Sequence, residues 1–112
     1  MIRATTPTHT FVFDVNPEES FSSILITYAQ NGEIILEKKK SDLTFATETA
    51  AGRGSVYTAS LRLSQQETKL FSAKPRNTVE IQIRALTPFG EALASDKRSI
   101  PVVDVLNDEV LL

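Results

Sequence analysis

Residues 77–87 of the chain read NTVEIQIRALT, and in this stretch apolar residues alternate with polar ones. Successive side chains of a β-strand point to opposite faces of the sheet, so Val79, Ile81, Ile83 and Ala85 would share one face. The pattern predicts a half-buried strand. Because an isolated strand leaves its apolar face in water, the rest of the chain must supply neighbouring strands and an opposing layer.

Similar runs on both sides of this stretch predict further strands. They occupy residues 8–15, 21–30, 34–38, 43–47, 56–63 and 91–98. Asn31-Gly32 predicts a two-residue hairpin, since both residues tolerate the positive φ that such a turn needs. In the first strand, residues 8–15, Phe11, Phe13 and Val15 share a face and the two phenylalanines are expected to point inward. Pro17 lies in the turn that ends this strand.

Ser64-Gln65-Gln66-Glu67 fits a helix capping box and predicts one short helical turn. Leu70 and Phe71 would plug one end of the structure. Together these elements predict an all-β fold, an immunoglobulin-like antiparallel β-sandwich of about seven strands with one helical turn near residues 64–71. We expect a single domain over residues 1–112, with an N-terminal arm at 1–7 and a C-terminal tail at 102–112.

Composition excludes several classes of function. The 112 residues carry 12 Lys and Arg against 14 Asp and Glu, a net charge of -2 that gives no general attraction to nucleic acid. There is no cysteine, which rules out a disulfide framework and thiolate metal sites. The start of the chain has no apolar signal region, and no run is long enough to cross a bilayer. We therefore expect no nucleic-acid partner, no membrane partner and synthesis in a cytoplasm.

No residue pattern predicts a catalytic, cofactor or metal site. His9 is the only histidine, and spacing identifies neither fellow ligands nor an orienting carboxylate, so it is interpreted as a surface or rim residue. The charged run Glu37-Lys38-Lys39-Lys40 is either a phosphate-binding patch or a solvated strand edge that blocks aggregation, and the second interpretation is favoured. The loop Ala50-Ala51-Gly52-Arg53-Gly54 lacks the helix start of a P-loop.

Partner contacts are the remaining candidates. The chain ends on the apolar residues Val110, Leu111 and Leu112, which should either pack on their own sheet or dock on another subunit. Residues 102–106 are expected to pack on the domain itself. Arg53, at the tip of a glycine-flanked loop, is a fourth contact candidate.

Several segments carry a family resemblance. They are residues 3–11 (RATTPTHTF), 26–32 (ITYAQNG), 63–68 (LSQQET), 81–85 (IQIRA) and 106–111 (LNDEVL). Together they resemble short proteins of tailed bacteriophages and prophages, and the resemblance spans nearly the whole chain. The chain differs from shorter relatives of that kind in having a longer loop around Ala50 to Gly54.

The resemblance implies a non-enzymatic virion structural protein, a tail or baseplate adaptor made in the bacterial host cytoplasm. Its implied partners are other phage structural proteins and further copies of itself in a ring. The alternatives are a capsid decoration protein and a carbohydrate- or receptor-binding module at the tail tip. The last would need exposed aromatic platforms, for which Tyr28 and Tyr57 are the candidates and tryptophan is absent.

Overall fold

The computed structural model describes residues 1–50, 52, 54–74 and 78–112. Its elements follow the chain in this order: β1 (Thr8–Phe13), α1 (Pro17–Ser20), β2 (Ser23–Gln30), β3 (Glu33–Lys39), the 3₁₀ turn η1 (Lys40–Asp42), β4 (Thr44–Ala50), β5 (Gly54–Arg62), α2 (Gln65–Lys69), β6 (Thr78–Leu86), β7 (Ala92–Ala94) and β8 (Arg98–Pro101). No helix in these ranges is long and apolar enough to cross a membrane.

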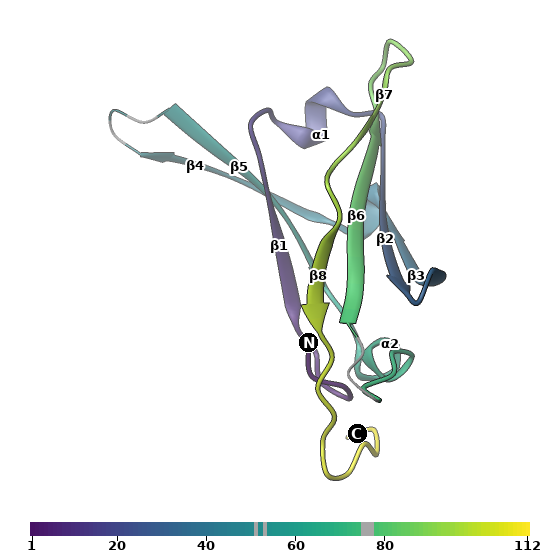
Figure 1. The fold of residues 1–112 in the computed structure, drawn as a ribbon. Helices are drawn as coiled ribbons and strands as arrows, with labels where there is room; N and C mark the ends of the chain where they lie inside the picture. The colour runs from purple at the N-terminus through teal and green to yellow at the C-terminus, as the bar shows by residue number, and fades with distance from the viewer. Residues whose placement is uncertain (51, 53, 75–77) are drawn as a thin grey trace.

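The eight strands of the described ranges form two antiparallel sheets (Figure 1). One has the order β1-β5-β4, and the other has the order β3-β2-β6-β7 with β8 also paired to β6. Helix α2 connects β5 in the first sheet to β6 in the second. The all-β sandwich predicted from the sequence is confirmed.

The core lies between the inner faces of the two sheets. Antiparallel pairing places Ile26 opposite Ile83 and Tyr28 opposite Ile81, while Ala59 and Leu61 come from the other sheet. The alternation along each strand puts these residues on one side, and the fully buried members include Ile26, Tyr28, Ala59 and Val79. Burial of a side chain such as Ile26 or Val79 is worth roughly 1.5–3 kcal/mol.

The Asn31-Gly32 hairpin forms as predicted. Asn31 has a φ of 52° and Gly32 a φ of 78°, the left-handed conformations that a turn between β2 and β3 requires. Strand β2 pairs with β3 on one side and with β6 on the other, so it is a central strand. Its outward residues are accordingly half-buried.

The predicted end of the first strand is wrong. Val15 is exposed, because β1 ends at Phe13 and the chain leaves the sheet before residue 15. The turn predicted after the first strand takes the form of the short helix α1, in which the Asn16 side chain accepts a hydrogen bond from the Glu18 amide and Pro17 occupies the first helical position.

The last predicted strand is divided into β7 and β8. At the break, the Ser95 hydroxyl accepts a hydrogen bond from the Ile83 amide at 2.9 Å, and the Ser95 amide donates to the Ile83 carbonyl at 2.8 Å. The serine side chain thus takes a backbone position in the ladder, and β6 pairs with β7 before the break and β8 after it.

Candidate protein interaction surfaces

The outer half of the β4–β5 hairpin projects from the sandwich (Figure 1). Strand β1 pairs with β5 only as far as Tyr57, so residues 54–56 of β5 pair with β4 alone. Glu48, Thr49, Ser55 and Val56 are all exposed, which leaves both faces of this part of the hairpin in water. We call residues 48–50 and 54–56 the hairpin arm. Arg53, the contact candidate at its tip, lies outside the described residues.

A free strand edge lies on the same sheet. The order β1-β5-β4 leaves one edge of β1 and one edge of β4 without a neighbouring strand within the described part of the chain. Beside β1 runs an open groove of about 620 Å³, lined by β1 itself and by residues of β6 and β8 that include Ile83 and Ile100. Unpaired backbone groups next to apolar side chains are the features that an added strand from a partner uses.

His9 lines this groove and is half-buried, which the interpretation of a surface or rim residue did not anticipate. Its Nδ1 lies 2.6 Å from the Tyr28 hydroxyl, and the two rings stack with centroids 5.6 Å apart. Burial, together with the nearby charge of the chain's amino terminus, lowers the pKa of His9. Burial and the Glu67 carboxylate raise the pKa of Tyr28, so its hydroxyl stays protonated. Tyr28 is fully buried and cannot serve as a sugar platform.

The two ends of the chain lie side by side. Ile2 forms a parallel bridge with Val103, and the backbone groups of Arg3 and Met1 exchange hydrogen bonds with Val103 at 2.8 and 2.9 Å. Val102 is buried in the core. Residues 102 and 103 therefore pack on the domain, as predicted for the start of the tail. The prediction is wrong at its other end, because Leu106 is fully exposed.

Arg3 connects the N-terminal arm, helix α2 and the tail. Its Nε donates to the Phe71 carbonyl at 2.8 Å, and its guanidinium pairs with Asp104 at 2.7 Å and with Asp108 at 3.2 Å. A hydrogen bond from Arg3, with a second from the Val105 amide, lowers the pKa of Asp104. Nothing in the sequence near residue 3 indicated this role, because its partners lie 66 or more positions away.

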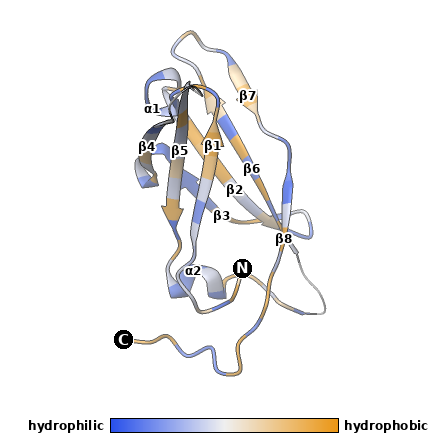
Figure 2. Cartoon of the chain, turned by 90° about the vertical axis from the view of Figure 1, so that its left-hand side faces the viewer, coloured by the Kyte–Doolittle hydropathy of each residue, from blue (hydrophilic) through white to orange (hydrophobic). Residues whose placement is uncertain are grey.

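The end of the tail is held by its backbone and presents its side chains to solvent. The Gln65 side chain donates to the Leu111 carbonyl at 3.0 Å and accepts from the Leu111 amide at 2.7 Å. Val110 is half-buried, whereas Leu111 and Leu112 are exposed, as is Leu106. In Figure 2 this segment is coloured largely as hydrophobic, yet it runs away from the two sheets.

The three consecutive lysines Lys38, Lys39 and Lys40 lie in three different environments. Lys38 pairs with Glu67 of α2, and Lys40 Nζ donates to the carbonyls of Glu18 and Phe21 at 2.8 Å each. Lys39 points outward and is exposed. Partial burial acts to raise the pKa of Glu67, but hydrogen bonds from Lys38 and the Ser64 amide outweigh it and lower that pKa. The ion pair between Lys38 and Glu67 links the edge strand β3 to helix α2.

Among the residues that the structure describes, no group of three or more acidic or histidine side chains could hold a metal ion. A scan against protein-family models found no match to the chain, and searches of curated proteins and of solved structures found none either. The candidate sites are therefore surfaces: the hairpin arm, the β1 edge and the tail.

Proposed function

We propose that the chain is a non-enzymatic virion structural protein of a tailed bacteriophage, an adaptor of the tail or baseplate that binds other structural proteins and further copies of itself. The observation that carries the proposal is the hairpin arm, whose Glu48 and Val56 are exposed although β4 and β5 remain paired there. A hairpin that contributes little to its own core is a costly edge in a monomer, and it becomes useful when a partner covers it.

Two further features support the same interpretation. The β1 edge offers unpaired backbone groups beside a groove, and Leu111 and Leu112 remain exposed although the backbone of Leu111 is held in place. Exposed apolar side chains on an ordered segment are typical of a contact surface. The resemblance of the quoted segments to small phage proteins supplies the expected setting, the virion.

The test shortens the arm without disturbing the sandwich. Glu48 and Val56 face each other in the ladder, so an Asn-Gly turn can replace residues 49–55 and join them directly. We expect the shortened protein to fold with an unchanged urea midpoint and to be missing from purified virions of a phage that encodes it. Mass spectrometry of the particles provides the readout, with the wild-type phage as the control.

Two results would contradict the proposal. One is the absence of the wild-type chain from virions. The other is incorporation of the shortened chain at the wild-type level, because the arm would then have no part in assembly.

A further inference from the structure

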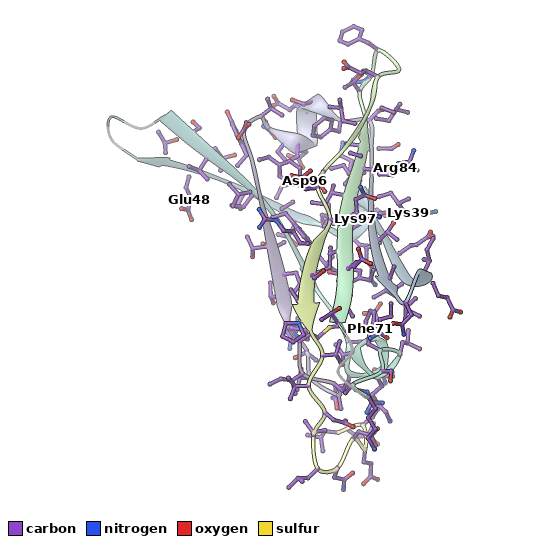
Figure 3. All side chains as sticks on the ribbon, viewed as in Figure 1. Lys39, Glu48, Phe71, Arg84, Asp96 and Lys97 are labelled. Atoms are coloured by element: carbon purple, nitrogen blue, oxygen red, sulfur yellow. The ribbon has the colours of Figure 1, made fainter. Side chains whose placement is uncertain are left out.

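A second groove, at the end of the five-stranded sheet where β2 begins, is rich in positive charge. It has a volume of about 570 Å³ and lies between the start of β2 and the ends of β3 and β6. Lys39, Lys40 and Arg84 line it, and no acidic side chain does. Figure 3 labels Lys39 and Arg84, which project from the side of this sheet that faces away from β1.

Strand register brings these cations together. Leu25 of β2 pairs with Lys39 on one side and with Arg84 on the other, so the two cations flank one half-buried leucine in a single row across the sheet. Leu86, in the neighbouring row, adds a second apolar side chain that is 39% exposed. The groove therefore offers an apolar floor between two positive charges.

The cations of the groove have no carboxylate partner within the described residues. Arg84 and Lys39 are exposed, and the salt bridges of the described chain involve other residues. The ammonium group of Lys40 donates to the backbone carbonyls of Glu18 and Phe21. A partner segment that fits here carries acidic side chains next to aliphatic ones.

The tail has this chemistry. Residues 106–112 read LNDEVLL, in which Asp108 and Glu109 stand beside aliphatic residues, and no Lys or Arg follows Arg98. Asp108 pairs with Arg3 of its own copy at 3.2 Å, so Glu109, which is exposed and has no salt bridge within the described residues, is the carboxylate that the segment offers to a second copy. The side chains of Leu106 and Leu112 are fully exposed. The bond between Gln65 and the Leu111 backbone holds part of the segment in one conformation, which reduces the entropy lost on binding.

The tail cannot reach the groove of its own copy. In Figure 1 the tail lies at the lower end of the molecule, whereas β7 and the adjoining ends of β2 and β6 lie in the upper half. Resting on the function proposed above, we infer that residues 106–112 of one copy dock in the Lys39–Arg84 groove of a second copy. The two surfaces differ, so the contact is heterologous and builds a ring or a filament.

The experiment uses a fluorescent peptide of residues 106–112 and the full-length protein. We expect saturable binding by fluorescence anisotropy, weakened roughly tenfold by Arg84→Glu, which replaces attraction with repulsion. Lys97→Glu changes the charge equally at an exposed site outside the groove and should bind the peptide as wild type does. Raising NaCl from about 0.05 M to about 0.5 M should also weaken binding.

A second test reverses the charge in the groove in one protein and the charge in the tail in another. Arg84→Glu and Glu109→Arg proteins should each associate more weakly than wild type. A mixture of the two should recover association, because the carboxylate introduced in the groove of one protein can pair with the guanidinium introduced in the tail of the other.

Absence of saturable peptide binding, or equal binding by the Arg84→Glu and Lys97→Glu proteins, would overturn the inference. Neither result affects the proposed function, which depends on the arm-shortening test in virions. If the groove variants behave as wild type while the shortened arm abolishes incorporation, this contact is wrong and the adaptor function stands.

Discussion

Burial of His9 makes the stability of the fold sensitive to mild acid. The pKa of His9 is lowered from 6.5 because the imidazole is half-buried, whereas in the unfolded chain it is not. As pH falls below about 6.5 the unfolded state takes up a proton that the folded state resists, so the free energy of unfolding decreases. Above that pH both states are neutral and the effect is absent.

We therefore predict that His9→Asn reduces the loss of stability between about pH 7 and about pH 5.5, since asparagine offers an acceptor to Tyr28 but does not titrate. Urea unfolding of the wild-type and His9→Asn proteins at the two pH values measures this loss of stability. His9 is the only histidine, and the carboxyl pKa values of Glu67 and Asp104 are lowered, so those groups respond mainly at lower pH. An equal loss in both proteins would show that His9 is not responsible.

Arg3 is the second residue whose contribution can be isolated. Arg3→Ala leaves the carbonyl of the buried Phe71 without the side-chain donor that it has now, and we predict a loss of about 1–3 kcal/mol in the free energy of unfolding. Lys97→Ala removes an exposed cation and should change the free energy of unfolding by less than about 0.5 kcal/mol. Similar values for the two variants would mean that Arg3 does not hold the ends of the chain.

At the scale of elements, helix α2 positions one plug residue and not two. The capping box is present as predicted, with the Ser64 amide donating to Glu67 at 2.9 Å and the Glu67 amide donating to Ser64 Oγ at 3.1 Å. The sequence also predicted that Leu70 and Phe71 both enter the core. Phe71 is 1% exposed and packs against Tyr28, but Leu70 is 56% exposed and that part of the prediction is wrong.

Leu70 and Phe71 are adjacent in the chain and provide a matched pair of variants. Phe71→Ala should lower the free energy of unfolding by about 3–5 kcal/mol, because it empties a buried aromatic site. Leu70→Ala should lower it by less than about 1 kcal/mol, as is usual for a surface position. Chemical denaturation measures both, and comparable losses would contradict the placement of the helix end.

The sequence predicted what depends on local pattern. Alternation identified the strands, and Asn31-Gly32 and the Ser64 box identified a hairpin and a helix start, because each acts within a few residues. It did not predict the division of the last strand at Ser95, which depends on a hydrogen bond to Ile83 in a neighbouring strand. Pairing between strands is a tertiary property, which the periodicity of a single segment does not predict.

The candidate surfaces were predicted less completely, for the same reason. The exposed tail residues Leu111 and Leu112 stood out because an apolar end has no local explanation. The Lys39–Arg84 groove could not be recognised from the sequence, since those residues lie far apart in the chain. They come together only through the register of β2 with its two neighbouring strands. The projecting arm depends on where β1 stops relative to β5.

At the scale of the whole molecule, nearly balanced charge is unevenly distributed. The groove between β3 and β6 collects cations, and the tail at the other end collects Asp104, Asp108 and Glu109. Asp104 and Asp108 share the single cation of Arg3, so the tail keeps an excess of negative charge. Such an arrangement favours head-to-tail contact between copies over a symmetric one, because like surfaces would repel. We therefore expect the protein to associate with further copies of itself.

Light scattering of the purified wild-type protein over a range of concentrations tests it most directly. The chain has a mass of 12.4 kDa, and we predict a larger mass that either rises with concentration or settles at a closed multiple. Deletion of residues 107–112 should reduce the measured mass to that of a single shortened chain. A wild-type protein that stays at 12.4 kDa at every concentration would contradict the account.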